Sequence, residues 1–142
     1  MVEIRVERTI AAPREQVFAW LADPASLTTA PLVIRAGWAE GVSGPGVGAL
    51  RKVVATGMWF HEEITAYDPP SSYSYRIVRS WPAFDHDGGT LTLTPTGDGT
   101  HVTWTSSYRH PARGGGRPME ALSSRLLPWN FRAILAAADR RL

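Results

Sequence analysis

The sequence PMEALSSRLLPWNFRAILAAADRRL, at residues 118–142, has the apolar spacing of one long amphipathic helix. Two neighbouring stripes of this helix carry its apolar side chains: Leu127, Phe131, Ile134, Leu135, Ala138 and Leu142 on one, and Met119, Leu122, Leu126, Ala133 and Ala137 on the other. The helix cannot bury so wide a face by itself, so the rest of the chain must cover it. Pro128 has no N–H to donate to the Ser124 carbonyl, which predicts a kink there.

The chain before this helix is rich in strand patterns. Period-two alternation and flanking turn residues predict seven strands, at 1–10, 33–40, 49–55, 58–67, 73–81, 90–94 and 100–110. Two short helices are predicted after the first strand, at 13–22 and 25–27, and loops at 41–48 and 82–89. This order predicts an α+β fold, in which a curved antiparallel sheet of about seven strands wraps around the C-terminal helix as one domain over 1–142.

The composition is that of a globular protein and excludes several classes of function. Of the 142 residues 44% are hydrophobic and 20% charged, and none is cysteine, so disulfides and thiolate metal sites are excluded. The arginines behind the net charge of +2 are scattered, which argues against nucleic acid binding. The first ten residues, MVEIRVERTI, alternate charged with apolar side chains. No apolar stretch of the sequence is long enough to span a membrane. We therefore expect no signal peptide, no stable membrane insertion, a cytoplasmic location, no cofactor, no metal, and a monomer or weak homodimer.

The register of one hairpin decides which polar side chains point toward the long helix. A two-residue turn at positions 56–57 fixes three cross-strand pairs: Ala55 with Met58, Val53 with Phe60, and Arg51 with Glu62. The apolar pairs must face the helix, and strand alternation carries Arg51 and Glu62 to the same face. The sequence therefore predicts an opposite-charge pair inside an apolar lining, either to bind a ligand or only to satisfy each other.

Other polar groups share this inward face. A buried polar group without a partner costs about 1 to 3 kcal/mol, so a solid core would not use them, and we infer a cavity between sheet and helix. The predicted ligand-binding residues are Arg51, Val53, Phe60, Glu62, Tyr73, Tyr75, Trp104, Ser106 and Tyr108 from the sheet, Leu122 and Leu126 from the helix, and Trp81 at the rim.

Three motifs in this order resemble the START-like superfamily of birch-pollen-allergen, polyketide cyclase and lipid-transfer proteins. They are GVGALR at 46–51, EEITAYDPP at 62–70 and GDGTHVTW at 97–104, and the resemblance covers essentially the whole chain. It implies a helix-grip fold with a deep cavity for lipids, sterols, polyketides or plant hormones. In hormone-receptor relatives, the residues matching Arg51 and Glu62 border the ligand. In the cyclases, a cavity arginine with tyrosine and serine hydroxyls orients a poly-ketone, roles that the resemblance offers to Arg51, Tyr75, Ser106 and Tyr108.

The four histidines are all predicted to lie away from the cavity. His61 and His101 fall on the outer face of the sheet, with Trp59 and Tyr67, and His110 falls in a loop. His86 lies between two aspartates in the 82–89 loop, where three adjacent side chains cannot easily converge on a metal ion. We interpret this segment as a solvated loop at the mouth of the cavity, which leaves the predicted inner face without a histidine.

Three functions fit these observations. The first is binding or transport of a small hydrophobic or amphipathic ligand, which enters near 41–48, 82–89 and the start of the long helix. The second is a polyketide cyclase or dehydratase, with Glu62, Arg51 and Tyr108 as candidate catalytic residues. The third is a protein-interaction module of the chaperone-activator type, which an exposed patch of Trp59 and Tyr67 would favour.

Overall fold

The structure is a computed structural model that describes residues 1–142, and its regular elements match the predicted order. The strands are β1 (Val2–Ile10), β2 (Val33–Trp38), β3 (Leu50–Ala55), β4 (Met58–Asp68), β5 (Ser72–Trp81), β6 (Asp85–Thr96) and β7 (Gly99–Arg109). The helices are α1 (Arg14–Ala22), the 3₁₀ turns η1 (Pro24–Thr29) and η2 (Ala112–Gly114), and α2 (Gly116–Arg141). The predicted α+β helix-grip fold, with two short helices after the first strand, is confirmed.

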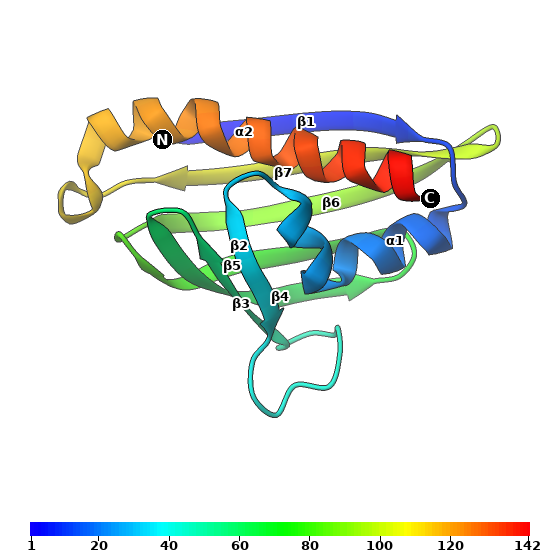
Figure 1. Cartoon of the computed structure of the whole chain (residues 1–142), viewed down its shortest axis with the longest axis horizontal. Helices are drawn as coiled ribbons and strands as arrows, with labels where there is room; N and C mark the ends of the chain where they lie inside the picture. Colours follow the sequence, from blue (N-terminus) through cyan, green and yellow to red (C-terminus); the bar gives the residue numbers. More distant parts are fainter.

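All seven strands form one antiparallel sheet in the order β1-β7-β6-β5-β4-β3-β2. The sheet curls, and α2 runs along its β1 and β7 side with α1 near its C-terminal end (Figure 1). The loop between β2 and β3 projects away from both helices (Figure 1). No helix is both long enough and apolar enough to cross a membrane.

The hydrophobic core fills one end of the space between the sheet and the helices. Its centre contains side chains from α1, from strands β1, β6 and β7, and from the second half of α2: Val17, Phe18, Leu21, Val6, Ile10, Leu93, Val102, Ile134, Leu135 and Ala138. Each large aliphatic side chain buried in this way stabilises the fold by about 1.5 to 3 kcal/mol. The first half of α2 contributes only Ser123 to the buried set, so this part of the helix has another neighbour.

The β3–β4 hairpin has the predicted register. Its pairs are Ala55 with Met58, Val53 with Phe60, and Arg51 with Glu62. Gly57 occupies the turn with a φ of 77°, a left-handed conformation that glycine adopts without strain. The predicted inward pair of charges therefore follows from turn chemistry and strand alternation alone.

The face predicted for Tyr67 is wrong. A β-bulge between Ile64 and Ala66 adds a residue to β4, which reverses the alternation beyond it. Tyr67 consequently packs against Phe18, with the ring centroids 5.5 Å apart. The exposed patch of Trp59 and Tyr67 is therefore absent, because only Trp59 remains on the outer face, where it lies against His61.

The predicted 82–89 loop is also wrong in most of its length. β6 begins at Asp85, since Asp85 pairs with Arg109 and His86 with Tyr108 on the continuous strand β7. A bulge follows between His86 and Gly88, where Gly88 has a φ of 137°. The pairing along β7 thus outweighs the turn-forming composition of the segment.

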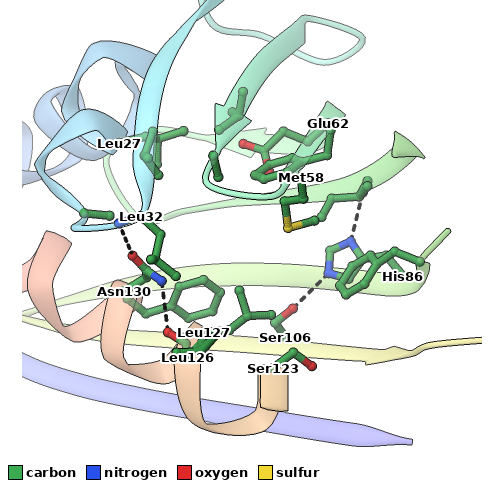
Figure 2. Close-up of a pocket in the computed structure, with 18 of the residues that line it drawn as sticks. Leu27, Leu32, Met58, Glu62, His86, Ser106, Ser123, Leu126, Leu127 and Asn130 are labelled. Atoms are coloured by element: carbon green, nitrogen blue, oxygen red, sulfur yellow. Dashed lines mark hydrogen bonds between the residues drawn. The ribbon is translucent and has the colours of Figure 1, made fainter. Parts of the chain in front are cut away.

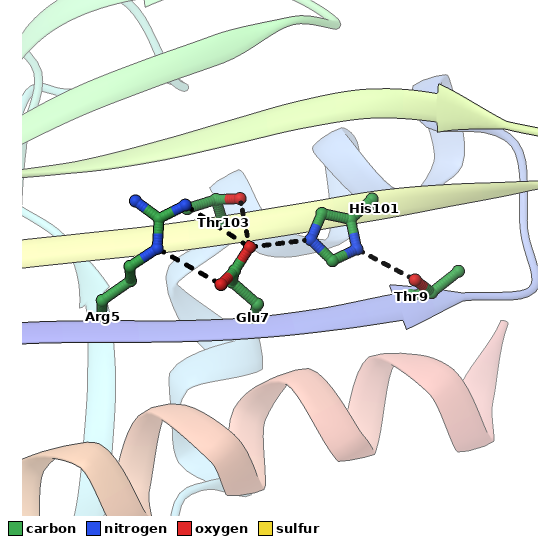
Figure 3. A network of polar contacts seen from close by, with 5 residues as sticks. All are labelled: Arg5, Glu7, Thr9, His101 and Thr103. Atoms are coloured by element: carbon green, nitrogen blue, oxygen red, sulfur yellow. Dashed lines mark hydrogen bonds and ion pairs between the residues drawn. The ribbon is translucent and has the colours of Figure 1, made fainter.

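The outer face of β1 and β7 carries a network of polar side chains (Figure 3). His101 Nε2 lies 3.0 Å from Glu7 Oε1 and His101 Nδ1 lies 2.9 Å from Thr9 Oγ1. Arg5 Nε donates to Glu7 Oε2 at 3.2 Å. Hydrogen bonds from His101 and Arg5 lower the pKa of the Glu7 carboxyl. His101 therefore lies on the outer face, as predicted, with its ring nitrogens occupied by surface partners.

α2 continues through Pro128 as one helix from Gly116 to Arg141. Two residues later Asn130 is buried, and its Nδ2 donates to the Leu126 carbonyl at 3.0 Å. Its Oδ1 accepts a hydrogen bond from the Leu32 N–H at 3.2 Å. Asn130 thereby ties the middle of α2 to the segment that precedes β2.

Candidate functional site

A pocket of about 310 Å³ lies between the curled sheet and the first half of α2 (Figure 2). It is lined by 28 residues, of which 18 are hydrophobic, so its wall is apolar with a minority of polar side chains. This volume and lining are in the range of small-molecule sites in proteins. The first half of α2 therefore borders the pocket, whereas its second half borders the core. This explains why Leu122 and Leu126 are apolar but absent from the core.

Nine of the twelve predicted ligand-binding residues line this pocket: Arg51, Val53, Phe60, Glu62, Tyr75, Trp104, Ser106, Leu122 and Leu126. Tyr73 does not, because it is buried beneath the pocket and donates its hydroxyl hydrogen to the Leu21 carbonyl at 3.0 Å. Trp81 does not, because it is 62% exposed at the end of β5. Tyr108 does not, because it is buried behind Ser123, whose Oγ lies 2.7 Å from its hydroxyl.

Arg51 and Glu62 form an ion pair within the wall of the pocket. Arg51 Nη2 lies 2.6 Å from Glu62 Oε1, and the two side chains are 2% and 5% exposed. The rings of Tyr73 and Tyr75 lie 5.5 and 5.7 Å from the guanidinium carbon, within the range of cation–π attraction. Arg51 Nε and Nη1 are buried without a hydrogen-bond partner. The pair is therefore only partly satisfied by the protein.

The two charges respond differently to burial. Burial favours the neutral form of Arg51, but the Glu62 carboxylate together with Tyr73 and Tyr75 outweighs this and raises the pKa of the guanidinium. Burial raises the pKa of Glu62, and the nearby Arg51 charge offsets only part of that rise. Arg51 therefore stays protonated, whereas Glu62 takes up a proton more readily than an exposed glutamate does.

The structure corrects the prediction for His86. This residue lies on β6, is 6% exposed and points into the pocket (Figure 2). Its Nδ1 accepts a hydrogen bond from the Ile77 N–H at 2.8 Å, so the proton of the neutral ring is on Nε2 and is donated to Ser106 Oγ at 2.8 Å. Burial lowers the pKa of His86 to about 4, which keeps the ring neutral.

This tautomer limits the chemistry available to Ser106. A serine nucleophile needs a histidine lone pair to accept its proton, and here the nearest ring nitrogen already carries a hydrogen. The other nitrogen of His86 is occupied by the Ile77 N–H. Ser106 and His86 therefore do not form a nucleophile and base pair, and the serine hydroxyl acts as a hydrogen-bond donor.

A second hydroxyl is fixed in the same way. Trp104 Nε1–H donates to the Tyr75 hydroxyl at 2.9 Å, and the indole stacks on Phe131 with ring centroids 4.1 Å apart. Burial raises the pKa of Tyr75, so the phenol stays protonated. Trp104, a predicted ligand-binding residue, thus belongs both to the core and to the pocket wall.

A third polar cluster lies where β7 leads into α2. Ser123 Oγ lies 2.7 Å from the Tyr108 hydroxyl and 3.0 Å from His110 Nε2. His110 follows β7 outside regular structure, as predicted, but it also lines the pocket, and its Nδ1 is buried without a partner. Burial lowers the pKa of His110. Two histidines therefore lie on the inner face, where none was predicted.

Several other lining residues were not predicted as site residues: Leu27, Ala30, Leu32, Thr56, Met58, Ile77, Pro82, Phe84, Ser123, Asn130 and Phe131 among them. Residues 41–48 are not part of the lining, so the predicted route past that loop is not supported. The exposed lining is instead at the β3–β4 turn, Thr56 and Gly57, and at Leu122 of α2, which is 53% exposed. No group of three or more His, Asp or Glu side chains is arranged to hold a metal ion.

The sequence matches the family described as "Polyketide cyclase / dehydrase and lipid transport" over residues 1–142. Among solved structures, the protein TTHA0849 from Thermus thermophilus is 26% identical, with a TM-score of 0.76 over 98% of this chain and 95% of that one. Ara h 8.0201 is 17% identical, with a TM-score of 0.65 over 96% of both chains. DynU16, a protein in the dynemicin biosynthetic locus, is 18% identical, with a TM-score of 0.69 over 99% of this chain and 46% of that one. A comparison with curated proteins found no match.

Proposed function

Because the chain belongs to the polyketide cyclase / dehydrase and lipid transport family, we propose that it binds and carries a small hydrophobic or amphipathic molecule in the pocket between its sheet and α2. The observation that supports this most directly is a buried arginine, in a mostly apolar wall, with two nitrogens whose N–H groups have no hydrogen-bond partner. A guanidinium in such a place costs free energy unless an oxygen meets those groups. A ligand with an apolar body and an oxygen-bearing end would supply it.

The pocket wall supports a ligand that is mostly hydrocarbon or aromatic. Phe60 and Phe84 line the pocket on the sheet side, and Phe131 and leucines line it on α2. The polar groups are few and lie on separate strands, which suits the orientation of one molecule rather than strong binding of a charged one. The proposal includes a single domain and a cytoplasmic protein that acts as a monomer or weak homodimer.

Native mass spectrometry of the protein purified from its own host tests this proposal. We expect an additional mass that is lost on denaturation and that belongs to a small apolar molecule. A parallel titration with anilinonaphthalene sulfonate, a hydrophobic anion, should give saturable fluorescence at one site per chain. Protein that carries no small molecule and takes up no hydrophobic probe would contradict a binding function.

A second candidate function is catalysis of cyclisation or dehydration of a poly-ketone. The observation in its favour is Glu62, a carboxylate on the pocket wall whose pKa is raised by burial and which lies beside Arg51. Glu62 would take a proton from the carbon next to a ketone, and Arg51 would stabilise the enolate that forms. Tyr108 has no direct part in this scheme, because it does not line the pocket.

Glu62→Gln distinguishes the two functions. It removes the proton acceptor and keeps the size and shape of the side chain, so turnover of a poly-ketone surrogate should be lost while binding remains. Turnover that survives the substitution would exclude Glu62 from the mechanism. Absence of turnover in the unchanged protein, with binding intact, would favour the carrier.

A further inference from the structure

Tyr75 and Ser106 are neighbours across a glycine. The register pairs Tyr75 with Gly89 and Gly89 with Ser106, so the two residues flank position 89 on strands β5 and β7. A Cβ at position 89 would overlap the ring and hydroxyl of Tyr75, which shows that the phenol lies over Gly89. Because both residues line the pocket, their hydroxyls face the same part of its wall.

Each of these hydroxyl oxygens accepts one hydrogen bond from the protein. The indole N–H of Trp104 can only donate, so the Tyr75 oxygen is the acceptor of that bond. The Ile77 N–H occupies His86 Nδ1, so His86 Nε2 donates to the Ser106 oxygen (Figure 2). Neither hydroxyl has another hydrogen-bond partner in the protein. Each oxygen therefore accepts one hydrogen bond from the protein, and its own hydrogen remains free to be donated to a ligand.

We propose that His86 and Trp104 are positioning residues that turn Ser106 and Tyr75 into a pair of hydrogen-bond donors for one ligand oxygen without hydrogen, such as a carbonyl. The inference rests on the proposed ligand-binding function and specifies its selectivity. A ligand hydroxyl is less favoured at this place, because once its oxygen accepts from the two hydroxyls its own hydrogen still needs an acceptor in a mostly apolar wall. Gly89 takes part by leaving room for the phenol.

The rest of the pocket strengthens this bias. The unpaired Arg51 Nε and Nη1 are also donors, and Glu62, the one carboxylate in the lining, is already paired with Arg51. A hydroxyl that accepts a hydrogen bond from a buried N–H is polarised by it. This polarisation makes the hydroxyl a stronger donor to the ligand. Arg51 thus adds further donors to the wall, while the Glu62 carboxylate already has a partner.

Three rigid molecules of one skeleton test the proposal: fluorene, fluorenone and fluorenol. Fluorene has no oxygen and measures the apolar pocket, whereas the other two differ only in carbonyl against hydroxyl. We expect fluorenone to bind about tenfold more tightly than fluorenol. This ratio corresponds to the free energy of one hydrogen-bonding group that is satisfied with fluorenone and left unpaired with fluorenol. The carbonyl stretching band of bound fluorenone should lie at lower frequency than in an apolar solvent.

The variants Tyr75→Phe and Ser106→Ala remove the donors, and Trp104→Phe removes the N–H that directs Tyr75 while keeping an aromatic ring. Each should reduce the preference for fluorenone and move its carbonyl band toward the apolar value. Trp38→Phe is the matched control, since Trp38 lies outside the pocket lining and should change neither. Circular dichroism checks that each variant is folded. If Trp104→Phe does not fold, Tyr75→Phe tests the same donor.

Two results would overturn the proposal, and they are distinguishable. If fluorene binds but fluorenone and fluorenol bind equally, or if the preference survives in the Tyr75→Phe and Ser106→Ala double variant, the donor pair is wrong and ligand binding stands. If none of the three molecules binds, the proposed ligand-binding function fails and this inference fails with it.

Discussion

The guanidinium of Arg51 and the carboxylate of Glu62 meet at 2.6 Å on adjacent strands, on the face that the β3–β4 register turns toward α2. Both side chains are removed from water, yet two guanidinium nitrogens remain without a partner. A pair of charges held in this way has a stability role and a ligand role that can be measured separately.

Arg51→Met should destabilise the protein by about 3 to 5 kcal/mol, because it leaves the Glu62 carboxyl buried without a counter-charge. The double variant Arg51→Met and Glu62→Leu should recover most of that loss, since a well-packed apolar pair is often as stable as a buried ion pair. Urea unfolding of Arg51→Met, Glu62→Leu and the double variant measures the coupling free energy between the two residues.

The same double variant separates ligand binding from stability. If Arg51 binds a ligand oxygen, the affinity for anilinonaphthalene sulfonate should fall several-fold even where stability is restored. Arg76→Ala is the control, since Arg76 is exposed on β5 and outside the pocket lining. An unchanged affinity in the double variant would leave the pair with a structural role only.

Stability should fall as the pH is lowered from about 6.5 toward 4, because of His86. Its pKa is about 4 in the folded protein against an ordinary value of 6.5, so the unfolded chain binds a proton in this range and the folded protein does not. The stability that neutral His86 contributes is fully present above pH 6.5. It is lost as the pH falls from 6.5 toward 4, and the total loss is roughly 3 kcal/mol.

Unfolding by urea at several pH values measures this loss, and His86→Gln should flatten that part of the profile. Gln keeps an acceptor for the Ile77 N–H but does not titrate. A profile that is the same in the variant and in the unchanged protein would assign the loss to other groups.

Gly89→Ala should destabilise the protein by about 1 to 3 kcal/mol, because the added methyl group overlaps the Tyr75 phenol. Gly44→Ala is the matched control, since nothing lies within 4 Å of a Cβ there. Tyr75→Leu combined with Gly89→Ala should recover part of the loss by removing the overlapping ring. Thermal unfolding of these variants, of Tyr75→Leu alone and of the unchanged protein checks this, and additive losses in the double variant would refute the steric explanation.

Asn130→Leu should cost about 1 to 3 kcal/mol, because the Leu32 N–H loses its acceptor in a partly buried place. Asn130→Asp keeps that acceptor and should cost less. Hydrogen exchange at the Leu32 amide is the specific measurement: it should be accelerated in the leucine variant and remain slow in the aspartate variant. Equal exchange in both would show that Asn130 does not hold this segment.

The sequence allowed the fold and the charged pair to be predicted because both depend on local patterns. The helical period of residues 118–142 required a broad sheet to cover it, and the turn at Gly57 fixed the register that faces Arg51 and Glu62 inward. Neither step needed knowledge of distant contacts.

The place of His86 could not be predicted in this way. Alternation counted back from Leu93 and Leu91 places Asp87 inward and His86 outward, and only the bulge at residues 86–88 reverses that order. Asp-His-Asp-Gly-Gly also has the composition of a loop, so no local signal announced a strand. Tyr67 was assigned to the wrong face for the same reason, since a bulge in β4 precedes it.

The uneven burial of α2 has a consequence for how this protein can diverge. Its second half carries Ile134, Leu135 and Ala138 into the core, and Asp139 is paired with Arg8 of β1 at 2.9 Å. Its first half mostly faces the pocket and solvent. We therefore expect substitutions before Pro128 to change the pocket wall with less loss of stability than substitutions after it, where the same helix also carries core residues.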